Sequence, residues 1–141
     1  MALVVPNTSE VAMLNRLVGA ASSGAQVMKL YKSGPVGISP FPDDDSTLTQ
    51  FTECTASGYA AITITTAGWT ASTSAGGTTT ATYSPDAVYT FSTSETVFGY
   101  YVVDLTSPTP NLLWAEAFSG GPFVLPSAGG QIQITPTVNL A

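Results

Sequence analysis

The amino-acid sequence predicts one mainly β domain over residues 1–141, an antiparallel β-sandwich that is jelly-roll-like and carries one short N-terminal helix. Short runs of β-branched and aromatic residues recur along the chain, with turn-forming Gly, Pro, Asn and Asp between them. One of these runs, residues 97–104, is apolar on both faces, as is typical of a strand that is covered on both sides. The length of 141 residues and the apolar content of 44% suffice for a single hydrophobic core.

The N-terminal region predicts an arm followed by a helix. Residues 1–6, MALVVP, are apolar and end at a proline, which indicates an extended arm that must dock on something. Asn7 and Glu10 have the spacing of a capping box, and apolar residues then recur at helical spacing as far as Val18. We therefore expect a helix over residues 8–18, ended by Gly19.

The next region predicts a strand, a long loop and a helical turn. Residues 27–31 have the composition of a short strand, and residues 33–46 form a loop with three prolines and three consecutive aspartates. A helical turn is expected over residues 48–53, with Ser46 or Asp45 as its N-cap.

Three further strands are expected before the centre of the sequence pattern is reached. Residues 59–66 alternate between apolar and polar positions, as a half-buried strand does. The stretch 70–80 is a low-complexity sequence of Thr, Ser, Gly and Ala and is expected to be a flexible surface loop. Residues 80–83 and 87–91 are strand candidates, separated by the turn signal Ser84-Pro85-Asp86.

The densest β pattern predicts a hairpin of residues 97–104 and 112–118, joined by a loop with two prolines. Strict alternation along the first strand gives two apolar faces: one with Val97, Tyr101 and Val103, the other with Phe98, Tyr100 and Val102. The second face must then pack against another sheet, a helix or another protein chain.

The C-terminal region predicts a loop and a last strand. The segment SGGPFVLPSAGG, residues 119–130, is rich in Gly and Pro and is expected to be a loop. The closing segment QIQITPTVNLA keeps a period of two, with Pro136 on its apolar face. Because proline lacks the backbone donor, this strand should lie at an edge or contain a bulge.

Charge is unusually sparse, at 9% of the residues with a net charge of −6. The basic residues are Arg16, Lys29 and Lys32 alone, which leaves no cationic footprint for nucleic acid. A surface with few ions loses little hydration on burial, which favours a protein that is partly buried in an assembly. The alternative is a secreted or otherwise stable β domain with hydroxyl-rich loops. The sequence shows neither a membrane span of about 20 apolar residues nor a signal peptide, so we expect synthesis in a cytoplasm and no membrane partner.

The sequence offers little for catalysis. It contains no histidine, which closes the Ser-His-Asp and Cys-His routes and makes zinc binding unfavourable. Its single cysteine, Cys54, is interpreted as a small apolar filler. Asp104 and Glu116 could approach across the hairpin as a carboxylate pair, or each could simply mark a strand end or a solvated position. We expect no enzyme activity and no cofactor.

Two binding hypotheses remain. Asp43-Asp44-Asp45 could hold a hard cation, but consecutive side chains diverge, and a solvated loop at a helix N-terminus is the preferred interpretation, without a metal. Aromatic residues could form a sugar-binding platform, although aromatics at strand spacing also serve as core or as interface anchors. The aromatics concerned are Trp69, Tyr100, Tyr101 and Trp114.

Three segments carry a resemblance to a known class of proteins: MALVVPNTSEVAMLNRLVG, FTECTASGYAAITIT, and GYYVVD…LLWAEAFSGGPFVL…GGQIQITPTVNLA. The chain resembles small structural proteins of tailed bacteriophages, in particular the cement or decoration proteins of the icosahedral head. The resemblance runs along most of the chain except residues 33–46, 70–80 and 105–111. It implies a non-enzymatic virion protein on the capsid surface, a homotrimer that bridges subunits of the major capsid protein. A tail, baseplate or glycan-binding virion protein is the alternative.

Residues that could contact the capsid or a second subunit are expected among apolar and aromatic side chains. The candidates are Leu3, Val4, Val5, Tyr100, Tyr101 and Trp114.

Deleting residues 2–5 tests whether the arm docks on a partner. Burial of Leu3, Val4 and Val5 would contribute about 1.5–3 kcal/mol each, whereas ordering their backbone costs about 1–2 kcal/mol per residue. An arm that docks should therefore be lost with little change in the melting temperature of the free protein but with weaker binding to particles or subunits. A large drop in melting temperature with binding retained would show instead that the arm is a strand of its own domain.

Overall fold

A computed structural model describes residues 26–34, 39–65, 68–73, 79–105 and 109–140. The predicted arm, the predicted helix and the candidate contacts Leu3, Val4 and Val5 lie outside these ranges. The described chain is mainly β, as predicted, and its strands pair antiparallel. In chain order the elements are β1 (Gln26–Ser33), the 3₁₀ turn η1 (Leu48–Gln50), β2 (Thr52–Glu53), β3 (Ile62–Ile64), β4 (Trp69–Thr73), β5 (Thr79–Tyr83), β6 (Ala87–Phe91), β7 (Glu95–Val97), β8 (Gly99–Asp104), β9 (Asn111–Ala117), β10 (Phe123–Leu125), β11 (Gly130–Ile134) and β12 (Thr137–Leu140).

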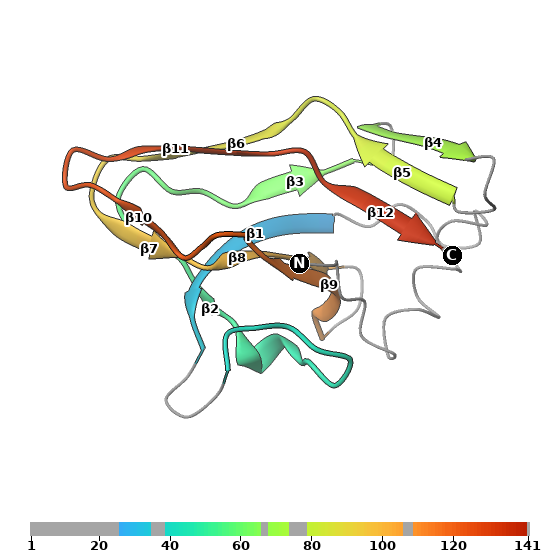
Figure 1. The fold of residues 1–141 in the computed structure, drawn as a ribbon, viewed down its shortest axis with the longest axis horizontal. Helices are drawn as coiled ribbons and strands as arrows, with labels where there is room; N and C mark the ends of the chain where they lie inside the picture. The colour runs from blue at the N-terminus through green and yellow to red at the C-terminus, as the bar shows by residue number, and fades with distance from the viewer. Residues whose placement is uncertain (1–25, 35–38, 66–67, 74–78, 106–108, 141) are drawn as a thin grey trace.

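The second half of the chain is one long antiparallel hairpin. Strand β8 pairs with β9, β7 with β10, β6 with β11 and β5 with β12, so four successive outgoing strands meet four returning strands in reverse order. The hairpin folds over on itself: β6 and β11 run along the top of the view in Figure 1, above β8 and β9. Strand β4 extends the pair of β5 and β12 on the outer side of β5.

Proline interrupts the long hairpin where it bends. Pro85 lies between β5 and β6 on the outgoing arm, and Pro136 lies between β11 and β12 on the returning arm. Neither can donate a ladder hydrogen bond, although the carbonyl oxygen of Pro136 still accepts from the Tyr83 amide at 2.9 Å. The closing segment therefore splits into two strands at Pro136. Ile134, Pro136 and Val138 are all buried, as the predicted period of two requires.

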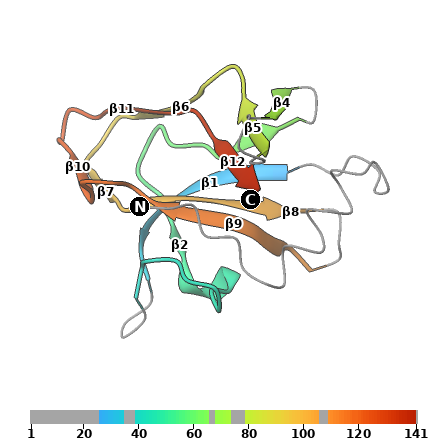
Figure 2. The same ribbon diagram turned by 45° about the vertical axis from the view of Figure 1, so that its right-hand side comes forward.

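Strand β8 lies inside a five-stranded sheet. It pairs with β9 on one side and with β1 on the other, and β2 and β3 pair with the far edge of β1. Figure 2 shows β1, β8 and β9 side by side beneath the folded hairpin. All six residues of β8 are buried, which agrees with the prediction that this strand is covered on both sides.

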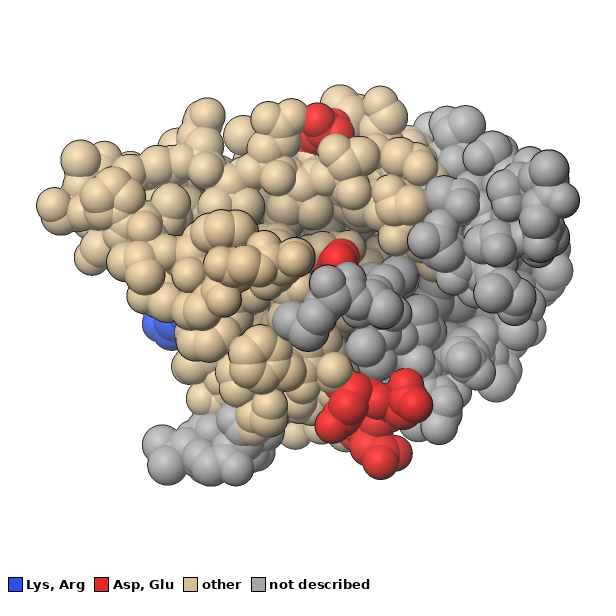
Figure 3. Space-filling view, in the orientation of Figure 1, with Lys and Arg blue, Asp and Glu red and all other residues tan. Residues whose placement is uncertain are grey.

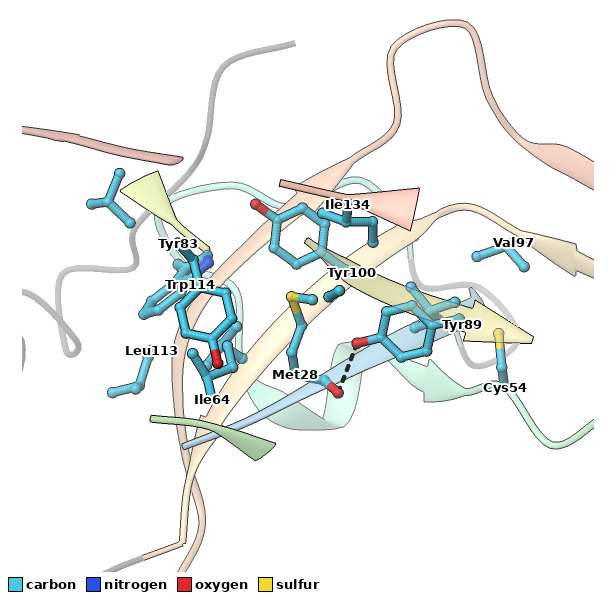
Figure 4. Packing of buried hydrophobic residues seen from close by; sticks show 14 of the residues in the cluster. Met28, Cys54, Ile64, Tyr83, Tyr89, Val97, Tyr100, Leu113, Trp114 and Ile134 are labelled. Atoms are coloured by element: carbon cyan, nitrogen blue, oxygen red, sulfur yellow. Dashed lines mark hydrogen bonds between the residues drawn. The ribbon is translucent and has the colours of Figure 1, made fainter. Parts of the chain in front are cut away.

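The main core lies between this sheet and the folded hairpin. Met28 and Leu30 of β1 and Tyr100 and Val102 of β8 pack with buried residues of β5, β6, β11 and β12 (Figure 4). The hydroxyl of the buried Tyr89 donates to the carbonyl oxygen of Met28 at 2.9 Å, drawn as a dashed line in Figure 4. This bond satisfies a buried polar group and links β6 to β1 across the core.

The other face of β8 is covered by the chain's own η1 segment. Phe51, directly after η1, stacks on Tyr101 with 5.4 Å between ring centroids and lies 4.9 Å from the ring of Tyr31. The side-chain amide of Gln50 donates to the carbonyl oxygens of Ser39 and Phe41 at 2.9 and 3.0 Å, which holds the preceding loop in place. These contacts form a second apolar cluster with Val27, Tyr31, Tyr101, Val103, Leu112 and Ala115.

The predicted faces of Val97 and Phe98 are wrong. Val97 packs in the main core with Tyr100, whereas Phe98 packs against the second cluster with Tyr101. Strand β7 ends at Val97 and β8 begins at Gly99, so the alternation is reset at Phe98. There the Phe98 amide donates to the Tyr31 carbonyl at 2.9 Å as the chain passes from one sheet to the other.

A bulge in β9 adds one residue to the main core. Val102 lies opposite Trp114 and Val103 lies opposite Leu112, so Leu113 has no partner position on β8. Two successive side chains, Leu113 and Trp114, consequently belong to the main core, while Leu112 and Ala115 belong to the second cluster.

Several predicted boundaries need correction. The strand expected over residues 59–66 is β3 alone, and the expected helical turn over 48–53 is η1 followed by β2. The expected loop 70–80 contains parts of β4 and β5, and the expected loop 119–130 contains β10. In each case a partner strand far away in the sequence supplies the ladder that local composition does not reveal.

The predicted N-cap of the helical turn is also wrong. Thr47 precedes η1 without a side-chain capping bond. Ser46 instead closes a turn with Asp43: its hydroxyl accepts from the Asp43 amide at 2.8 Å and donates to the Asp43 carboxylate at 2.9 Å.

Replacing Gly99 by alanine should destabilise the protein by several kcal/mol. A Cβ atom there would overlap the Glu116 carbonyl oxygen of β9 and would lie 2.8 Å from the Tyr31 ring, so the central pairing must shift. Urea denaturation measures the loss. The control is Gly130→Ala, whose Cβ would meet only the mobile tip of Leu125 at 3.1 Å. Equal stability of the two variants would contradict the close approach of β9 at Gly99.

Candidate interaction surface

The aromatic residues expected at an interface lie inside the protein. Tyr100, Tyr101 and Trp114 are exposed by only 2, 3 and 2%. Tyr100 and Trp114 belong to the main core, and Tyr101 lies under Phe51 in the second cluster. We therefore do not retain these three residues as contacts for another chain.

The same burial removes the proposed sugar platform. Trp69 packs edge-on against Trp114 with 5.8 Å between ring centroids and against Tyr83 with 5.3 Å, so these aromatic faces are used internally. Burial, and then the nearby Glu116 carboxylate, raise the pKa of the Tyr100 hydroxyl well above its usual value. Burial likewise raises the pKa of the Tyr101 hydroxyl, so neither group exchanges a proton near neutral pH.

Asp104 and Glu116 do not form a carboxylate pair. Glu116 lies opposite Tyr100, whereas Asp104 lies opposite Asn111 at the other end of β8. Four residues along a strand correspond to about 13 Å, which exceeds the separation of about 5–9.5 Å in glycoside hydrolases. The buried Asp104 and the half-buried Glu116 are thus separate features of the hairpin.

The three aspartates are organised as a turn. The Asp43 carboxylate accepts from the Asp45 amide at 3.2 Å and from the Ser46 hydroxyl at 2.9 Å. Among the described residues there is no group of three or more His, Cys, Asp or Glu side chains arranged to hold a metal ion. The geometry therefore agrees with the solvated-loop interpretation of this segment.

An exposed apolar patch lies on and beside β10. Phe123 and Val124 are 45 and 73% exposed. The Phe123 ring packs on the half-buried Phe118 with 5.5 Å between centroids, and Phe118 in turn contacts Tyr100 at 6.3 Å. We define the β10 patch as Phe118, Pro122, Phe123, Val124 and Pro126.

The β10 patch lies in a part of the chain without charge. Residues 117–141 contain no Asp, Glu, Lys or Arg. In Figure 3 the part of the visible face that carries β10 and β11 is uniformly tan, and the acidic side chains gather elsewhere. Glu95, on the partner strand β7, is turned to another segment, because its carboxylate accepts from the Thr55 and Ala56 amides at 3.1 Å each.

Sequence reasoning missed this patch because it interpreted residues 119–130 as a loop. Two signals in the sequence could have found it. The apolar triplet Phe123-Val124-Leu125 stands between two prolines, and the charge-free run around it is 25 residues long in a chain that is already poor in charge.

No protein-family model, curated protein or solved structure matches the chain. Within the described ranges, no helix is long and apolar enough to cross a membrane. Interpretation of the surface therefore depends on the geometry of the chain itself.

Cys54 should react with a thiol reagent only after unfolding. The side chain is 1% exposed, and burial, followed by the charge of Glu95, raises the pKa of its thiol to about 12. Because the thiolate is the reactive species, native protein at pH 8 should be labelled by a disulfide reagent far more slowly than protein in denaturant. Rapid stoichiometric labelling of the native protein would contradict this burial.

Proposed function

We propose that this chain is a non-enzymatic structural protein of a tailed-phage virion: a capsid cement or decoration protein. In this proposal it is made in the host cytoplasm and joins the capsid surface as a homotrimer that bridges subunits of the major capsid protein. The observation that carries the proposal is the exposed, charge-free β10 patch on a chain whose other large aromatic side chains mostly serve its own core.

The surface supports this role energetically. Burying charged groups is costly because they lose hydration, and residues 117–141 contain none. Burying a Phe or Val side chain fully contributes about 1.5–3 kcal/mol. A protein that adds binding energy at capsid junctions without catalysing a reaction requires a surface of this kind.

The strand order supports a jelly-roll-like sandwich as the fold of such a protein. A jelly roll is an eight-stranded antiparallel hairpin folded into two packed sheets. Here four outgoing strands, β5 to β8, pair in reverse order with β9 to β12, and a core lies between the central sheet and the folded-over part. The resemblance of the sequence to phage cement proteins supports the same interpretation.

Removing the gene from the parent phage tests the proposal. Heads that lack the protein should release their DNA at a lower temperature or a milder osmotic shock than wild-type heads, because junctions between capsid subunits lose binding energy. Adding the purified protein back should restore resistance, and immunogold labelling should place it on heads. Unchanged head stability together with labelling confined to tails would refute a cement role and favour the tail or baseplate alternative, whereas capture by a glycan array would favour receptor binding.

A further inference from the structure

We propose that the β10 patch is a self-association surface, on which a second copy of this chain packs through uncharged side chains. The inference names a surface for the proposed homotrimer and in that respect rests on the proposed function. Its test uses the isolated protein alone, so the two can fail separately.

The charges of the chain point to this surface. With a net charge of −6, two copies repel wherever their acidic side chains meet. The described basic residues cannot offset this repulsion, because Lys29 is paired with Glu53 at 2.8 Å and the Lys32 ammonium bonds Thr55 at 2.6 Å. Contact between copies is therefore favoured where neither copy presents a carboxylate.

The β10 patch meets that condition and also offers apolar area. Its exposed Phe123 and Val124 lie within the charge-free run, and the nearest acid along the partner strand, Glu95, is engaged with backbone amides of residues 55 and 56. A second copy brings the same uncharged surface, so the patch is complementary to itself. A partner selected by opposite charge would instead meet the aspartates of residues 43–45.

The patch is built for side-chain packing rather than for adding a strand. Strand β10 has only three residues, and Pro122 and Pro126 stand directly before and after it. Proline lacks the amide donor that a new ladder needs. Phe123 is supported from below by Phe118, and through it by Tyr100, so the exposed ring has a rigid base.

Val124→Asp tests the inference. The wild-type protein should associate between micromolar and millimolar concentration in sedimentation or light scattering. The variant should weaken the dissociation constant about thirtyfold or more, because an anchor in an interface is replaced by a buried charge. Because Val124 is 73% exposed, the variant should keep the melting temperature and the circular dichroism of the wild type.

Phe41→Asp is the matched control. Phe41 is 48% exposed, close to the 45% of Phe123, but it lies in the loop that carries Asp43, outside the β10 patch. The control should associate like the wild type. A wild-type protein that stays monomeric throughout, equal association of Val124→Asp and wild type, or equal weakening by both variants would each overturn the inference.

Discussion

The complete burial of β8 is the constraint on which the rest of the structure depends. A strand with six buried residues needs a cover on each face and a hydrogen-bonding partner along each edge. Strands β1 and β9 supply the edges, the folded-over hairpin supplies one cover, and Phe51 with the η1 segment supplies the other. Because the chain meets all four requirements itself, the aromatic side chains that looked like interface anchors are used for folding.

The sequence predicted those features that depend on local pattern. The mainly β class, strand β6, the hairpin of β8 and β9, and the buried side of the last strands all follow from periods of two that the structure confirms. The opposite faces of Tyr100 and Tyr101 were also predicted correctly.

The features that the sequence did not predict depend on partners far along the chain. The assignment of Val97 and Phe98 failed because the strand changes sheets at Phe98, and the extra residue Leu113 arises from its register with β8. Strand β10 is too short to be recognised without β7 beside it. The β10 patch was missed for the same reason, since a surface is defined by what lies next to it as well as by its own residues.

The long hairpin has a consequence for the order in which the chain can fold. Strands β8 and β9 are the pair closest together in sequence, while Thr79 of β5 waits for Leu140 of β12. Closing the short loop costs less entropy than bringing distant strands together, so folding begins at β8 and β9 and zips outward. During synthesis, β5, β6 and β7 leave the ribosome well before their partners. Their sparse charge then leaves few ions to keep unpaired strand edges apart, and crowded nascent chains are exposed to mispairing until β12 arrives.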